Sequence, residues 1–75
     1  MQTIHFYTGE IEGSNNKDFS CYIEARTACE AENKLLTYYE ENLMSSMGEI
    51  ESIGVYDITA NEYYGMRKNS KYSFI

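Results

Sequence analysis

The sequence predicts an α+β domain in which one α-helix packs on one face of a single antiparallel sheet, in the order β-β-α-β-β-β. Residues 2–8 and 18–25 alternate apolar and polar side chains, which is the period of half-buried strands. Residues 28–44 repeat apolar side chains with the period of a helix. The 75 residues are short enough for one domain, 1–75, and contain no proline.

Two strands are expected before the helix, as an antiparallel hairpin. In the first strand, Ile4 and Phe6 point to one side, and His5 and Tyr7 point to the other. Residues 9–17 form a long loop, marked by two glycines and an Asn pair. In the second strand, the core face carries Phe19, Cys21, Ile23 and Ala25. Its outer face carries Ser20, Tyr22 and Glu24.

The helix is predicted from about Ala28 to Met44 or slightly beyond, ending before Gly48. Thr27 and Glu30 have the spacing of a capping box, in which each side chain binds the other residue's amide. The apolar side of the helix contains Ala28, Ala31, Leu35, Leu36, Tyr39 and Leu43.

A three-stranded meander is expected after Gly48. Its first strand covers residues 49–58, and the apolar phase shifts between Ile50 and Ile53, which suggests a bulge near Ser52. Residues 61–67 and 71–75 are expected to form the other two strands, each after a polar turn.

Few residues suggest catalysis, so we expect the chain not to be an enzyme. It has no glycine-rich phosphate loop or nucleophile elbow, and its single histidine leaves no metal pattern. Cys21 and Cys29 are expected to be small buried thiols, and a Cys29–His5 dyad is the disfavoured alternative. Glu32 is expected at an edge of the helix, with its carboxylate in water, and partner binding is its alternative. No cofactor and no metal site are predicted.

Composition indicates a folded, acidic protein. Leu, Ile, Val and Phe make up 14 of 75 residues and the net charge is −6, which borders on disorder, but eight tyrosines supply additional apolar area. The N-terminus has no signal-peptide pattern, and no run is apolar enough for a membrane span. We therefore expect a soluble protein in the cytoplasm of a host cell, with no membrane contact.

The predicted interface is the sheet face that one helix leaves uncovered, because exposed tyrosine is typical of protein interfaces. Tyr7, Tyr22 and Glu24 are the candidates on that face. Candidates on the helix are Tyr38, at the margin of its apolar side, and Glu40 and Glu41 on its polar side. Residues 1–66 have a net charge of −9 and residues 67–75 a net charge of +3. Such charge disfavours direct contact with nucleic acid and favours a basic protein partner. The alternative is that the charge serves only solubility.

The segment "CYIEARTACEAENKLL", followed by strands ending in "RKNSKYSFI", resembles several small phage-encoded proteins, among them anti-CRISPR proteins with a short sheet and one helix. The resemblance covers the layout of residues 19–75. Some inhibitors of this kind are basic, whereas this chain is acidic. The resemblance implies a non-enzymatic inhibitor that occludes a nucleic-acid-handling defence complex by protein contact. The alternative is a structural or regulatory homodimer that associates through its uncovered tyrosine-rich face.

Overall fold

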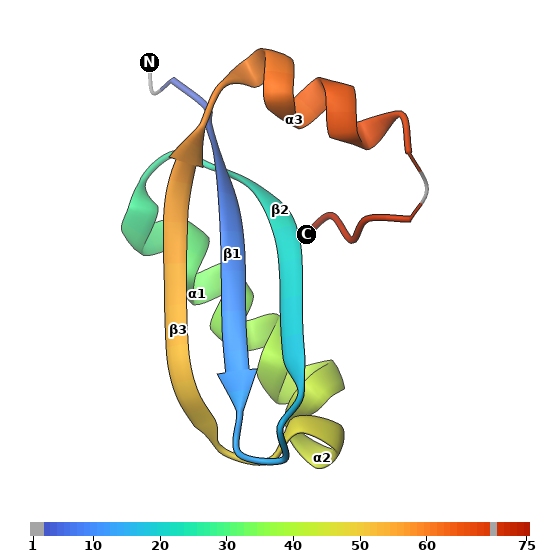
Figure 1. The fold of residues 1–75 in the computed structure, drawn as a ribbon. Coiled ribbons are helices and arrows are strands. Elements are labelled where there is room, and N and C mark those ends of the chain that lie inside the picture. The colour runs from blue at the N-terminus through green and yellow to red at the C-terminus, as the bar shows by residue number, and fades with distance from the viewer. Residues whose placement is uncertain (1–2, 70) are drawn as a thin grey trace.

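A single antiparallel sheet forms the centre of the molecule (Figure 1). The computed structural model describes residues 3–69 and 71–75. The sheet contains β1 (His5–Gly13), β2 (Asp18–Ala25) and β3 (Ile50–Ile58) in the order β2-β1-β3. A long helical segment packs across one face, so the predicted α+β class is confirmed (Figure 1). Within residues 3–69 and 71–75, no helix has both the length and the apolar character needed to cross a membrane.

The β1–β2 hairpin is present, but its loop is shorter than predicted. β1 continues through Gly9 to Gly13, and the loop is only residues 14–17. These two glycines allow close packing instead of marking a turn. A Cβ atom on Gly9 would lie 2.8 Å from Cδ1 of Ile23 and 3.0 Å from Cδ2 of Leu35. A Cβ atom on Gly13 would lie 2.8 Å from Cβ of Met47. The missing side chains therefore let the helical layer approach the central strand.

The helical layer has three consecutive parts: α1 (Ala28–Tyr38), the π-helical turn η1 (Tyr39–Leu43) and α2 (Met44–Met47). The predicted bounds are confirmed, and the segment ends at Gly48, whose φ is 75°. The Thr27 hydroxyl accepts a hydrogen bond from the Glu30 amide over 3.1 Å, which is one half of the predicted capping box. The other half is not formed between these two described residues, and a Glu30 carboxylate oxygen lies 4.0 Å from Lys34 Nζ instead.

The π-helical turn follows from the spacing of the apolar residues. Side chains at intervals of four face the sheet: Ala31, Leu35, Tyr39, Leu43 and Met47. On an α-helix, each step of four residues rotates the stripe by about 40° beyond a full turn. Over four steps, Met47 would face away from the sheet. The wider turn at 39–43 offsets this drift, and Met47 is 2% exposed.

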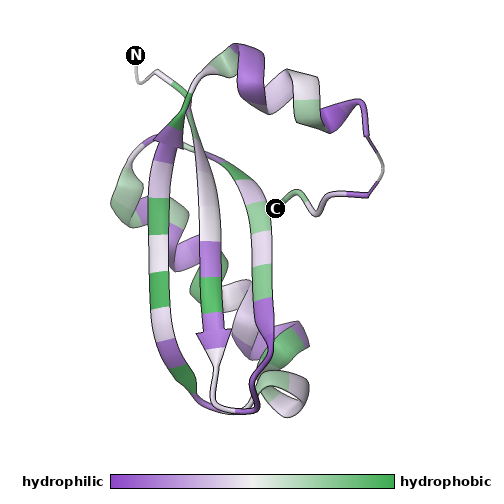
Figure 2. Ribbon diagram, viewed as in Figure 1, coloured by the Kyte–Doolittle hydropathy of each residue, from purple (hydrophilic) through white to green (hydrophobic). Residues whose placement is uncertain are grey.

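The core lies between this helical layer and the sheet. Its buried members are Tyr7, Ile11, Cys21, Ile23, Ala25, Ala31, Leu35, Tyr39 and Met47. Ile53 and Val55 of β3 pack against it and are only partly buried because β3 is at the sheet edge. Apolar residues on β3 are visible as alternating green bands in Figure 2, and β1 shows a green band between purple ones. The predicted bulge is confirmed: Glu12 pairs with Ser52 and Gly13 pairs with Ile50, which leaves Glu51 as the extra residue.

The predicted orientation of β1 is wrong. Tyr7 points into the core and is 5% exposed, whereas Phe6 lies on the opposite face. Both faces of β1 are apolar near its start because a second helix covers the outer face there. Alternation alone therefore did not identify the face that packs against α1.

Residues 61–67 form a helix, not the predicted strand. The helix is α3 (Ala60–Arg67), and Thr59 begins it with a complete capping box. The Thr59 hydroxyl accepts from the Glu62 amide over 3.1 Å, and a Glu62 carboxylate oxygen accepts from the Thr59 amide over 3.2 Å. The sequence Thr59-Ala-Asn-Glu62 contains this signal, and it is the feature that predicts the helix. The alternation of side chains around Tyr63 and Tyr64, which predicts a strand, is a weaker signal than this capping box.

Residues 71–75 are also not an antiparallel meander strand. Phe74 forms an isolated parallel bridge with Tyr22 at the outer edge of β2. The Tyr22 amide donates to the Ser73 carbonyl over 2.9 Å, and the Ile75 amide donates to the Tyr22 carbonyl over 3.0 Å. The chain reaches this edge because α3 carries it across the end of the sheet (Figure 1). A parallel pairing requires such a crossover, which the meander prediction omitted.

Candidate functional site

Among residues 3–69 and 71–75, side chains cover the outer face of the sheet, on the side away from α1, only at one end. There, Phe6 stacks on Tyr63 of α3 with ring centroids 4.4 Å apart, and Tyr22 stacks on Phe74 at 5.3 Å. We call the remaining part the open face. Its residues form rows across the strands: Thr8–Tyr56, Ser20–Glu10–Gly54 and Asp18–Glu12–Ser52.

Acidic side chains dominate the lower rows of the open face. Glu12 and Asp18 are direct cross-strand partners, and Glu10 is two residues along the same strand face. All three are exposed. Like charges directly opposite each other on a sheet are destabilising. The protein therefore keeps an unfavourable pair of acidic residues at two exposed positions, where an uncharged residue would fit equally well.

Tyr56 is the exposed aromatic residue of the open face. Its side chain is 57% exposed and lies along β3 over Gly54. A Cβ atom on Gly54 would be only 2.7 Å from the Tyr56 hydroxyl oxygen. The absent side chain at Gly54 thus gives the ring room to lie flat beside the acidic rows. Sequence reasoning did not name Tyr56, although its alternation with Val55 in β3 was a usable signal.

The predicted sheet-face residues are only partly brought together. Tyr7 does not belong to the interface because it is buried in the core, where burial and the nearby Asp57 and Glu30 charges raise the pKa of its hydroxyl. Tyr22 lies on the outer face as predicted, but it is half-buried by Phe74 and Tyr72. Glu24 is half-buried at the covered end.

The predicted helix residues lie on the other layer. Tyr38 is half-buried and stacks on Phe19, with centroids 5.3 Å apart and an interplanar angle of 16°. Glu40 and Glu41 are exposed on η1. None of the three is on the same face as Tyr56, so the six predicted residues do not form one contiguous site.

Charge is divided between the two ends of the sheet. The end with the β1–β2 loop carries seven exposed acids, Glu10, Glu12, Asp18, Glu40, Glu41, Glu49 and Glu51, and the single cation Lys17. The other end carries five acids and five cations. The net charge of −6 therefore resides at the loop end. We call this the acidic end.

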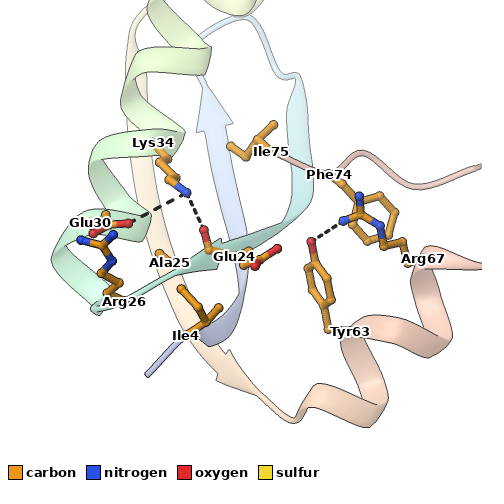
Figure 3. A pocket seen from close by; sticks show the side chains of 10 residues that line it. All are labelled: Ile4, Glu24, Ala25, Arg26, Glu30, Lys34, Tyr63, Arg67, Phe74 and Ile75. Atoms are coloured by element: carbon orange, nitrogen blue, oxygen red, sulfur yellow. Dashed lines mark hydrogen bonds and ion pairs between the residues drawn. The ribbon is translucent and has the colours of Figure 1, made fainter. Parts of the chain in front are cut away.

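A pocket of about 420 Å³ lies at the opposite end, along the outer edge of β2 (Figure 3). It is lined by Ile4, Glu24, Ala25, Arg26, Glu30, Lys34, Tyr63, Arg67, Phe74 and Ile75. Lys34 Nζ donates to the Glu24 carbonyl over 2.6 Å and lies 4.0 Å from a Glu30 carboxylate oxygen. Arg67 Nη1 donates to the Tyr63 hydroxyl over 2.7 Å.

The two cysteines and Glu32 differ in their exposure to solvent. Cys21 is 2% exposed, and burial raises the pKa of its thiol to about 11 despite a hydrogen bond from Gly9. A thiol in that state is a poor nucleophile at neutral pH. Cys29 is exposed, so the prediction that both thiols are buried is wrong for this residue, which lies in the first turn of α1 outside the core. Glu32 is exposed, as expected for an edge position. No group of three metal-ligating side chains comes together in residues 3–69 and 71–75.

No protein-family model, curated protein sequence or solved structure matches the chain.

Proposed function

We propose that the chain is a non-enzymatic binding protein whose open face and acidic end bind a basic surface of a partner protein. The observation that carries the proposal is the position of exposed Tyr56 beside Glu10, Glu12 and Asp18 on one uncovered sheet face. Tyrosine supplies rigid contact area at low entropic cost, and the carboxylates accelerate encounter with a basic surface.

The unfavourable Glu12–Asp18 pair supports this proposal. Both carboxylates sit on adjacent strands without a cationic neighbour across the ladder. An Arg or Lys side chain from a partner placed between them would remove the repulsion and gain two charge-assisted hydrogen bonds. Binding energy is then gained from a feature that costs stability in the free protein.

The partner class follows from charge. Proteins that handle nucleic acid carry basic surfaces because they neutralise phosphates. We therefore propose that this chain acts as an inhibitor, in the manner of the anti-CRISPR proteins it resembles in layout, by covering such a surface in the cytoplasm of a host cell. The chain itself is too acidic to favour direct nucleic-acid contact.

Homodimerisation through the open face is the competing proposal, and the acids oppose it. In a two-fold dimer the same patch meets itself, so Glu10, Glu12 and Asp18 would meet the same carboxylates of the second copy. Sedimentation of the isolated chain tests this: a monomer is expected, and a tight dimer lost in Tyr56→Ala would favour the homodimer instead.

The experiment for the partner is affinity purification from cells carrying nucleic-acid-based defence systems, with the wild type and a Glu10→Lys/Glu12→Lys double variant as parallel baits. The wild type should retain a basic protein that the double variant loses. Glu32→Lys/Asp57→Lys is the matched control, because it makes the same charge change at exposed positions outside the open face. Equal retention by both variants would reject the open face as the interface.

A further inference from the structure

The pocket at the edge of β2 contains an exposed arginine, Arg67, whose guanidinium is held by aromatic side chains. The guanidinium of Arg67 donates to Tyr63 Oη over 2.7 Å, and its Cζ atom lies 5.7 Å from the Tyr63 ring centroid and 5.4 Å from that of Phe74. Tyr63 is only 1% exposed, so the group that holds the guanidinium is rigid. Arg67 follows Tyr63 by one helical turn on α3, which brings the two side chains together.

Most donors of this guanidinium are unused. Arg67 has five N–H groups, and Tyr63 accepts from one of them. In residues 3–69 and 71–75, the ion pair within 4.0 Å is Lys34–Glu30, so no carboxylate there neutralises Arg67. A planar fork held in place before binding is suited to a carboxylate, because little side-chain entropy is lost when the two hydrogen bonds form.

The charge of the lining selects a singly charged anion. Among the lining side chains, Arg26, Lys34 and Arg67 are cationic and Glu24 and Glu30 are anionic, which gives a formal side-chain sum of +1. Lys34 is already engaged by the Glu24 carbonyl and the Glu30 carboxylate. In Figure 3, the Glu24 side chain extends from β2 toward the α3 side of the pocket. A doubly charged phosphate would therefore be repelled by Glu24 more strongly than a carboxylate.

The remaining lining is apolar and lies beside Arg67. Ile4 lies on the same side of the sheet as Phe6, and Phe74 and Ile75 come from the segment that pairs with Tyr22. A volume of about 420 Å³ is within the usual range for small-molecule sites. We propose that this pocket binds the carboxylate of a small organic acid on Arg67, while the apolar body of the acid packs against Ile4, Phe74 and Ile75. This site is separate from the open face and does not depend on the proposed function.

The test is a titration of the isotopically labelled full chain with sodium phenylacetate, followed by two-dimensional NMR at constant ionic strength. Phenethylamine, which carries the same ring and the opposite charge, and inorganic phosphate are titrated in parallel. Saturable shifts at the Arg67 side chain and at the amides of residues 24–26 are expected with phenylacetate alone. Tighter binding of phosphate, equal shifts with phenethylamine, or no saturable shift with phenylacetate overturns the proposal.

Variants identify the group that binds the carboxylate. Arg67→Gln should weaken phenylacetate binding by about tenfold or more, because a hydrogen-bonded charge pair is lost. Arg67→Lys keeps the charge without the fork and should have an intermediate affinity. Glu24→Gln should bind more tightly than the wild type, since a like charge is removed. The control is Lys68→Gln, which removes the same charge from the next residue outside the pocket lining. An equal loss in Lys68→Gln and Arg67→Gln shows non-specific attraction and contradicts the proposal.

Discussion

The ring of Phe6 lies against the ring of Tyr63, with centroids 4.4 Å apart and planes inclined by 34°. This contact joins the first strand to the last helix and fixes the covered end of the outer face. Tyr63 also meets Tyr64 and Phe74 edge-on, with centroids 5.3 and 5.5 Å apart. The molecule therefore has a small second cluster of aromatic residues on the side of the sheet away from the main core. That cluster positions both the pocket and the boundary of the open face.

Removing the Tyr63 ring should destabilise the fold. Tyr63→Ala deletes a side chain that is 1% exposed, and the cavity and lost transfer free energy should lower the free energy of unfolding by about 3 kcal/mol. Tyr63→Phe keeps the ring and loses only the bond to Arg67, so a loss on the order of 1 kcal/mol is expected. Urea denaturation of both variants measures these values. A Tyr63→Ala loss no larger than that of Tyr63→Phe would show that the second cluster contributes little.

Two glycines should respond to alanine in opposite directions. Gly9→Ala places a methyl group 2.8 Å from Ile23 and 3.0 Å from Leu35 in the close-packed layer between β1 and α1, and should cost about 1–3 kcal/mol. Gly65→Ala meets nothing within 4 Å inside α3 and should stabilise by about 0.5–1 kcal/mol through helix propensity. Thermal unfolding of the two variants beside the wild type gives the sign of each change. Stabilisation by Gly9→Ala would contradict the close approach of α1 to β1.

Cys21 should make stability depend on alkaline pH. Its pKa is raised from 9.0 to about 11 in the folded state, so the folded chain holds a proton that the unfolded chain releases. The stabilising contribution is complete below pH 9 and is lost as pH rises from about 9 to 11, by on the order of 2 kcal/mol.

The contribution of Cys21 is isolated by comparing variants, because tyrosines and lysines titrate in the same range. Cys21→Ala should lower stability at pH 7, and its difference from the wild type should shrink between pH 9 and 11. Cys29→Ala, at an exposed thiol, should track the wild type at every pH. A constant difference between Cys21→Ala and the wild type across that range would falsify the linkage.

Asp18→Lys should make the folded protein more stable and, at the same time, slow its association with a basic partner. The change turns the like-charged cross-strand pair with Glu12 into an opposite-charged pair, and should raise the free energy of unfolding by roughly 0.2–1 kcal/mol. The same change should slow association with a basic partner, and the effect should diminish at high salt because exposed charges are screened beyond about 8–10 Å. Chemical denaturation and binding kinetics measure the two effects on one protein. Greater stability with unchanged association would remove Asp18 from the interface.

Tyr56→Ala should change the rate of dissociation from the partner, whereas Asp18→Lys changes the rate of association. Truncating an exposed ring that packs only on complex formation should mainly speed dissociation, while the carboxylates that guide encounter remain. Tyr64→Ala is the matched control, since Tyr64 is 53% exposed but lies on α3. Equal dissociation rates for the two variants would mean that the ring of Tyr56 is not a contact.

Local chemistry in the sequence was sufficient for the elements with strong periodic signals. The alternation in residues 18–25 correctly placed Cys21, Ile23 and Ala25 in the core. The Thr27 cap and the apolar stripe defined the bounds of the long helix, and the phase shift before Ile53 located the bulge. Each of these signals is carried by residues close in the chain, which is why no tertiary information was needed. The capping box at Thr59 is equally local, and it is a stronger signal than the alternation that predicts a strand over residues 61–67.

Tertiary structure alone decided which face of β1 became the core and where the open face lies. Phe6 and Tyr7 are both apolar enough to be buried, and their faces are distinguished only by what packs on each side: Leu35 and Ile23 approach over Gly9, and Tyr63 covers Phe6. The pocket likewise depends on the crossover that brings Arg67 and Phe74 to the edge of β2. The sequence by itself determined the period of each segment, because period is a property of the local backbone. The partner of each face depends on contacts between residues far apart in the chain, and these form only when the whole core packs.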